Sequence, residues 1–340
     1  MSQPFASPLS TLDPLPPEII QVIFGHLIIL SQSSKALASS LSRTSKHFLS
    51  LISPQLYRRL SLCASNAAQF FYGLEGLQSG ELRHFDESFG RDGSGLEGKS
   101  LAERRLIWIG LVREVAIEDA EALKACYKAV KAIVGPKPQL RQGRFHGRTL
   151  FFWGRAKGEE ATLTLSSHLC ETFGSANPNN APYVFPILYA LAQFCSLVID
   201  LPHDLERMME SSIPAFHAMC RGLAPCVKSV TVNNYRATPF EAKTIYASGF
   251  FSFFDSSLSG GRLSTVRLVL APGSEQLQEM LHIARLAASA ALPEVTIAFD
   301  NYQLQPGETK MQIQQAVEEA HERAEEESCI VSLGVAFKVL

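Results

Sequence analysis

One stretch of the chain matches a nucleotide-binding motif. Residues 93–100 read Gly-Ser-Gly-Leu-Glu-Gly-Lys-Ser and fit the phosphate-binding pattern G-x-x-x-x-G-K-[ST]. In such a loop the glycines let backbone N–H groups face the phosphates, the lysine (Lys99) neutralises charge and the serine (Ser100) holds magnesium. A helix starting at Leu101 would add the dipole of its N-terminus, and Asp200, after an apolar run, could complete a magnesium site.

The residues before this motif argue against a nucleotide site. A phosphate-binding loop follows a buried hydrophobic strand, whereas residues 84–92 read His-Phe-Asp-Glu-Ser-Phe-Gly-Arg-Asp. The three acidic side chains in this segment would repel a polyphosphate. Nucleotide binding therefore stays only as an alternative.

Other catalytic and metal-binding patterns are missing from the sequence. It contains no Gly-x-Ser-x-Gly elbow and no His-Glu-x-x-His. The seven cysteines form no Cys-x-x-Cys pair, and His217, Cys220 and Cys226 lack the second ligand pair of a zinc site. The glutamates at 318–319 and 325–327 fit the solvated face of an amphipathic helix. We expect no cofactor, no metal and no catalytic residue.

The N-terminal region has a helical pattern instead. Pro16 and Pro17 suit the first turn of a helix, because a proline there loses no hydrogen bond. Glu18 follows, with a charge that is favourable at a helix N-terminus. Apolar residues then recur every three or four positions, first at Ile19, Ile20, Ile23, Phe24 and Leu27 and later at Leu37, Leu41 and Phe48. We predict short helices joined by a spacer at 28–36, with Pro54 breaking the chain.

The order of these residues resembles the F-box motif. It begins Leu15-Pro16-Pro17-Glu18, continues through the two apolar turns and Thr44-Ser45-Lys46, and ends Pro54-Gln55-Leu56-Tyr57. Three details depart from the family pattern, namely a longer spacer, Thr44 where a Val is usual and Tyr57 where a Trp is usual.

The resemblance implies a substrate-receptor subunit of an SCF-type cullin–RING ubiquitin ligase. Such a subunit binds a Skp-family adaptor, and through it the cullin scaffold, while its C-terminal domain holds a target protein that the sequence does not identify. Catalysis then belongs to a recruited ubiquitin-conjugating enzyme. The adaptor-binding residues implied by the resemblance are Leu15, Pro16, Ile19, Ile20, Ile23, Phe24, Leu27, Leu41, Ser45, Lys46, Phe48, Leu56 and Tyr57.

The rest of the chain alternates between short β-like and helical runs. The whole chain then divides into a leader (1–14), an F-box-like helical module (15–62), a helix with a polar linker (63–100) and an α/β repeat domain (101–340). The predicted strands are Val112–Ile117, Thr149–Trp153, Thr162–Leu165, Leu197–Leu201, Val227–Val232, Thr265–Leu270, Val295–Phe299 and Ile330–Phe337. The predicted helices of this domain are Glu118–Val134, Phe185–Phe194, Leu205–Leu223, Phe240–Leu258, Glu275–Leu292 and Lys310–Glu326.

The fold class predicted is therefore α/β, a small all-α module followed by an irregular β/α solenoid. The last strands recur at intervals typical of solenoid repeats, and the polar ends of the runs at 230–234 and 296–301 resemble a degenerate leucine-rich repeat. Asparagine there could hydrogen-bond backbone that the next turn would leave bare. An ordinary α/β domain with a parallel sheet is the alternative, because strand–helix alternation fits both.

Charge and hydropathy limit the possible partners. A net charge of −2 without a basic run disfavours nucleic acid, and the apolar runs at 19–30 and 183–201 are too short or too interrupted to span a membrane. Scattered thiols and no secretory signal favour the cytoplasm or nucleus. We expect the aromatic clusters at 151–153 and 250–254 to pack in the core, and a cluster that faced solvent on a concave surface would be the first candidate for a partner site. A stand-alone repeat scaffold capped by the N-terminal helices remains the second alternative.

Overall fold

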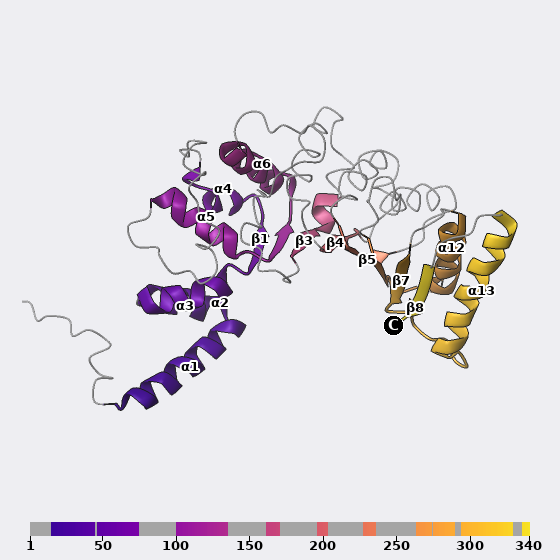
Figure 1. The fold of residues 1–340 in the computed structure, drawn as a ribbon, viewed down its shortest axis with the longest axis horizontal. Helices are drawn as coiled ribbons and strands as arrows, with labels where there is room; N and C mark the ends of the chain where they lie inside the picture. Colours follow the sequence, from indigo (N-terminus) through magenta and orange to yellow (C-terminus); the bar gives the residue numbers. More distant parts are fainter. Residues whose placement is uncertain are drawn as a thin grey trace, which may run out of the picture.

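The computed structural model describes residues 15–44, 46–74, 100–134, 161–170, 196–202, 227–235, 263–273, 275–289, 294–328 and 335–340. Three helices at the N-terminus lead into one open, parallel sheet whose strands follow one another along an arc (Figure 1). The fold is thus mixed α/β, as predicted. The predicted strand at 149–153, the predicted helices at 185–194, 205–223 and 240–258, and both aromatic clusters lie outside the described residues.

The first helix, α1 (Pro17–Ser33), begins where the prolines predict. The carbonyl of Pro16 accepts hydrogen bonds from the backbone N–H groups of Ile19 and Ile20. The helix then continues to Ser33. The prediction of a spacer at 28–36 is therefore wrong for residues 28–33. No proline or glycine follows Gly25 in this stretch, and the chain turns into an extended conformation only at Ser34.

Helices α2 (Lys35–Thr44) and α3 (Lys46–Leu56) pack with α1 around a small core. Pro54 lies inside α3, so the predicted break is wrong. The helix ends two residues later, and the missing N–H of Pro54 therefore costs a bond only in the last turn. The core consists of the buried side chains of Ala38, Phe48 and Ile52, with Phe24, Leu27, Leu41 and Leu56 packed against them.

The sheet begins earlier than predicted. Strand β1 (Arg59–Leu62) lies in the segment assigned to the helical module, and it starts three residues after α3 ends. Its pattern has period two, since Leu62 is fully buried while Arg59 and Ser61 are exposed. The short helix α4 (Ala67–Phe70) follows within the segment predicted as a helix with a polar linker (63–100), and the helix α5 (Leu101–Leu111) begins at Leu101.

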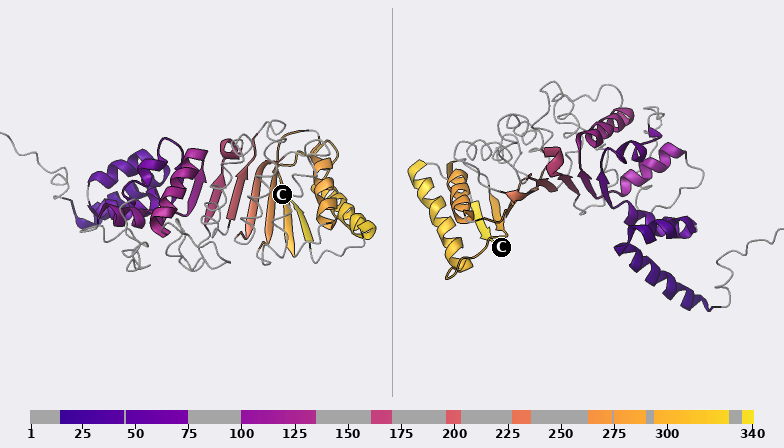
Figure 2. Two further views of the ribbon diagram at one scale, coloured as in Figure 1. Left: turned by 90° about the horizontal axis from the view of Figure 1, so that it is seen from above. Right: turned by 180° about the vertical axis from the view of Figure 1, so that it is seen from behind.

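The remaining strands overlap their predicted positions, although residues 330–334 of the predicted strand Ile330–Phe337 lie outside the described residues. They are β2 (Glu114–Ile117), β3 (Thr162–Leu165), β4 (Ser196–Asp200), β5 (Ser229–Tyr235), β6 (Thr265–Leu270), β7 (Val295–Asp300) and β8 (Val335–Val339). The predicted helices at 118–134, 275–292 and 310–326 are confirmed as α6 (Ala120–Val134), α12 (Gln276–Ser289) and α13 (Lys310–Ser328). All pairings are parallel, and the strand order β1 to β8 equals the chain order. The views from above and behind show the strands side by side, with α12 and α13 beside the C-terminal strands (Figure 2).

Each strand turns one set of side chains inward and the other outward. One row of paired residues across the sheet is buried, and it contains Val115, Leu163, Leu197, Val230, Val266, Ile297 and Phe337. This row packs into the main core together with residues of α6, α12 and α13. The outward side of the sheet therefore remains uncovered by the described helices.

Two asparagines tie neighbouring strands together at their ends. Asn234 donates from Nδ2 to the carbonyl of Leu201 (3.3 Å), and Asn301 donates to the carbonyl of Leu270 (2.9 Å). Both have positive φ (56° and 63°), a conformation that asparagine tolerates better than most residues. The prediction that asparagine at these strand ends bonds to neighbouring backbone is confirmed.

Candidate partner-docking site

The outer face of α1 carries apolar side chains that no other described element covers. Ile19, Val22, Ile29 and Leu30 are 46%, 57%, 61% and 56% exposed. At about 100° per residue these four positions fall within an arc of about 100° on the helix. Large apolar side chains gathered on one exposed face are typical of a protein-binding surface. We call this set, together with the half-buried Ile23, the α1 outer face.

The opposite face of α1 packs inward. Phe24 meets Phe48 of α3 edge to face, with ring centroids 4.8 Å apart, and Leu27 joins the same cluster. Ser31 is buried and donates a hydrogen bond to the carbonyl of Ile28 (2.6 Å). Helix α1 is therefore apolar on two sides, one used for its own core and one left open.

The predicted adaptor-binding residues divide between these two faces. Pro16 and Ile19 are exposed, and Leu15, Ile20 and Ile23 are half-buried. The others with described side chains pack within the small core or against the sheet domain, and they are Phe24, Leu27, Leu41, Phe48, Leu56 and Tyr57. The side chain of Lys46 and the whole of Ser45 lie outside the described residues.

Sequence reasoning missed three residues of the α1 outer face. Val22, Ile29 and Leu30 were not among the predicted contacts, although they follow Ile19 at intervals of three, ten and eleven residues. The signal was present in the sequence, because residues 19, 22, 26, 29 and 30 form one helical stripe. The predicted spacer concealed it by ending the helix near Leu27.

The three helices are fixed to the sheet domain through aromatic contacts. Tyr57, just after α3, stacks on Trp108 of α5 with ring centroids 5.1 Å apart and planes 13° apart. The guanidinium of Arg105 also lies over the Trp108 ring, with Cζ 5.0 Å from the ring centroid. Burial raises the pKa of Tyr57, and the nearby charge of Arg105 partly offsets this. The orientation of the α1 outer face is thus set by side-chain packing as well as by the short connection.

The nucleotide-binding alternative touches the described residues only at Ser100 and Asp200. The Ser100 hydroxyl accepts the N–H of Glu103, and the Glu103 carboxylate accepts the N–H of Ser100 (2.6 Å). A carboxylate therefore already sits at the N-terminus of α5, where a phosphate would bind. Asp200 accepts a hydrogen bond from Asn233 at 2.6 Å. It ends β4, which is two strands away from β2, the strand that follows α5. Residues 93–99 lie outside the described residues.

The outward face of the sheet is polar and low in relief. One register position carries a hydroxyl in five successive strands, at Thr162, Ser196, Ser229, Thr265 and Thr296. Two ion pairs lie on this face, since Arg59 contacts Glu114 (2.8 Å) and Arg267 contacts Asp300. The hydrogen bond from Arg267 lowers the pKa of Asp300, which burial opposes. Such a surface suits a polar partner segment better than a small apolar ligand.

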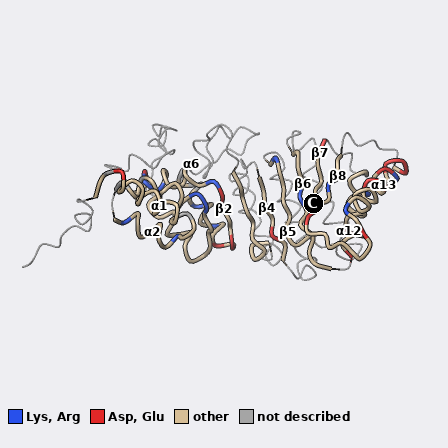
Figure 3. The backbone as a smooth tube through the Cα atoms, turned by 90° about the horizontal axis from the view of Figure 1, so that it is seen from below, with Lys and Arg blue, Asp and Glu red and all other residues tan. Residues whose placement is uncertain are grey.

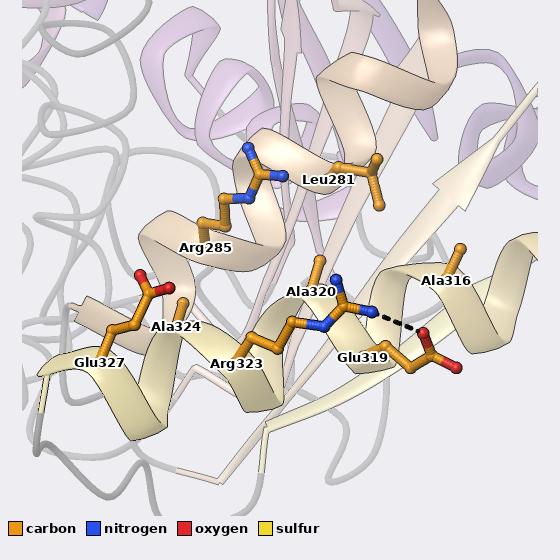
Figure 4. Close-up of a pocket in the computed structure, with 8 residues that line it drawn as sticks. All are labelled: Leu281, Arg285, Ala316, Glu319, Ala320, Arg323, Ala324 and Glu327. Carbon is orange, nitrogen blue, oxygen red and sulfur yellow. Dashed lines mark hydrogen bonds and ion pairs between the residues drawn. The ribbon is translucent and has the colours of Figure 1, made fainter.

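A groove of about 500 Å³ lies between α12 and α13 (Figure 4). Ala316, Ala320 and Ala324 belong to its lining, and Arg285 approaches it from α12. Arg323 is already paired with Glu319 at 3.0 Å. The charges of the lining balance, since Arg285 and Arg323 stand beside Glu319 and Glu327. Figure 3 shows acidic residues along α13. Its lining offers no nucleophile beside a base.

The described part of the chain holds no group of three or more His, Cys, Asp or Glu side chains arranged to bind a metal. Within those same residues, no helix combines the length and apolar character needed to cross a membrane. Comparison with known proteins adds no assignment, because no protein-family model, no curated protein and no solved structure matches the chain significantly.

Proposed function

We propose that the protein is a substrate-recognition subunit of an SCF-type ubiquitin ligase. The three N-terminal helices form an F-box-like module that docks on a Skp-family adaptor, and the adaptor links it to the cullin scaffold. The chain itself is not catalytic in this proposal. The following domain, an irregular leucine-rich-repeat-like solenoid, holds the target protein in the cytoplasm or nucleus.

One observation carries the docking proposal. The α1 outer face exposes four large apolar side chains, and Val22 and Ile29 are more than half exposed. A monomer gains nothing from leaving such a face in water, whereas a partner gains about 25 cal/mol for each Å² of apolar surface that it covers. The F-box-like sequence order supplies the identity of the partner, and the exposed face supplies a surface for it.

Two features support the target-binding role of the sheet domain. The order of its strands in the sheet is the same as their order along the chain. This arrangement is expected when similar units stack. The asparagine bonds at Asn234 and Asn301 repeat between neighbouring units. The outward face of the sheet is then a long polar surface built from several strands, and we assign it to the target.

Co-elution of the purified chain with a Skp-family adaptor tests the docking role. A one-to-one complex is expected from the full-length protein. Substituting Leu15→Ala together with Pro16→Ala should remove the complex and leave the sheet domain folded, because both residues lie at the start of α1, away from the main core. A double variant that binds with full affinity would exclude the start of α1 from the interface.

The stand-alone scaffold is the second candidate, and the stacking of Tyr57 on Trp108 favours it. In that case the N-terminal helices are a cap for the sheet domain. Deletion must stop at residue 56 to compare the two candidates, because β1 begins at Arg59. A truncated chain that keeps its melting temperature supports a separate module, and one that unfolds supports the cap.

A further inference from the structure

The α1 outer face has one titratable residue at its centre. His26 is exposed and lies one turn after Val22 and one turn before Ile29 and Leu30. On a helical wheel of about 100° per residue it falls in the middle of the arc that these apolar residues occupy. A partner that covers the apolar side chains must therefore also cover the imidazole.

Among the described side chains of the N-terminal helices, none of opposite charge is placed beside His26. Glu18, the acidic residue of α1, lies eight residues earlier, which is about 12 Å along the helix. Helix α2 contributes Lys35 and Arg43, and it packs against the opposite, inner side of α1. No acidic side chain described on α2 or α3 faces His26.

Docking would remove water from this imidazole. A charged imidazolium would be costly to bury among apolar side chains, so the neutral form is the one that fits. A neutral imidazole still carries one N–H, and a buried N–H needs an acceptor. The acceptor must come from the partner, since the neighbouring side chains on this face are hydrocarbon.

We infer that His26 determines which surface α1 accepts: an apolar surface with a single neutral hydrogen-bond acceptor, a carbonyl or hydroxyl oxygen, opposite the imidazole. This inference rests on the proposed docking function and adds the chemistry of the contact to it. A carboxylate is disfavoured as the acceptor, because it would be buried against hydrocarbon with only one partner.

Calorimetric titration of a purified Skp-family adaptor into three full-length chains tests the inference. The chains are the wild type, His26→Leu and His26→Gln. Leucine keeps the apolar contact and removes the N–H donor, so we expect affinity at pH 7.5 to fall about 5- to 100-fold, the range for a buried acceptor left unpaired. Glutamine keeps an uncharged donor and should retain most of the affinity.

The comparison of the two variants separates a hydrogen-bonding role from a merely structural one. Leucine keeps the apolar contact without a donor, and only glutamine restores a donor. Binding that is lost in His26→Leu and recovered in His26→Gln would therefore identify the N–H as the contributing group.

A His26→Leu chain that binds as tightly as the wild type would overturn the inference, because it would mean that no acceptor faces the imidazole. No complex with the wild type at pH 7.5 would instead contradict the proposed docking function itself, and the two results are distinguishable within one set of titrations.

Discussion

The side chain of Asn301 should hold a measurable part of the stability of the sheet. It donates to the carbonyl of Leu270, a residue that is only 1% exposed, so its loss leaves a buried acceptor unpaired. We expect that loss to cost about 1–3 kcal/mol. Alanine would in addition have to adopt the positive φ of 63°, at about 1–2 kcal/mol. The Asn301→Ala chain should therefore lose about 2–5 kcal/mol.

Two further substitutions separate the hydrogen-bond contribution to this loss of stability from the contribution of the backbone conformation. Asn301→Gly removes the hydrogen bond but accepts the positive φ, and it should be less destabilising than Asn301→Ala by up to about 1 kcal/mol after the entropy cost of glycine. Asn233→Ala is the matched control, because this asparagine bonds to the half-exposed carboxylate of Asp200 and not to buried backbone. We expect it to cost less than about 1 kcal/mol.

Urea denaturation followed by circular dichroism gives the change in unfolding free energy. Hydrogen exchange of peptides from β6 and β7 then locates it, which is necessary because stacked units can unfold separately. A loss below about 0.5 kcal/mol for Asn301→Ala, within the range of ordinary surface substitutions, would refute the reasoning. Equal protection of β6 and β7 in wild type and variant would refute it as well.

Three further perturbations have defined outcomes. Gln314 bonds to the Phe337 carbonyl and the Val339 N–H on the outer edge of β8, so Gln314→Leu should expose that edge and promote self-association, measured by light scattering against a Gln315→Leu control. Removing the stacked ring by Tyr57→Ala should cost about 1–3 kcal/mol and separate the unfolding of the N-terminal helices from that of the sheet, seen by comparing tryptophan fluorescence with circular dichroism. Burial lowers the pKa of His321, with Glu325 and Glu322 opposing. Its stability contribution is therefore complete above the ordinary histidine pKa of about 6.5 and is lost as pH falls through the lowered value, so urea midpoints should fall between pH 7 and pH 5 in wild type but not in His321→Phe.

The sheet was predictable because its strands have simple signals. Buried apolar residues alternate with polar ones along most of β3 and β6, and both strands were predicted at their observed limits. Parallel strands buried on one face repeat the same pattern of alternation, so each run supports the assignment of the next. The asparagines at strand ends were predictable for a different reason, since few other residues combine a side-chain donor with a tolerance for positive φ.

Strand β1 was not predictable from the same signals. It has four residues, and only Leu60 and Leu62 alternate with polar side chains. It follows a helix after a two-residue turn, so its residues fit the end of a helical pattern equally well. Its pairing with β2, which lies more than fifty residues away in the chain, decides the conformation.

The candidate site was predictable only in part, because periodicity identifies an apolar face without saying what covers it. Phe24 and Leu27 have the spacing expected of contact residues, but they pack against Phe48 and Ile52 inside the module. Val22 and Ile29 have the same character and remain exposed. Which stripe of an all-apolar helix faces its own chain depends on how α2 and α3 fold back, and that is a tertiary property.

The most direct test of the account is a calorimetric titration of a Skp-family adaptor with a chain whose α1 outer face is charged. In the Val22→Asp, Ile29→Asp double variant both substitutions are at exposed positions, so the fold should be kept. The apolar contacts that these two side chains would make with the adaptor should be lost. At about 2 kcal/mol or more for each anchor, affinity should fall by at least about 100-fold. Met311→Asp is the matched control, since Met311 is 78% exposed on α13, and it should bind like the wild type. A double variant that binds as tightly as this control would contradict the assignment of α1 as the docking helix.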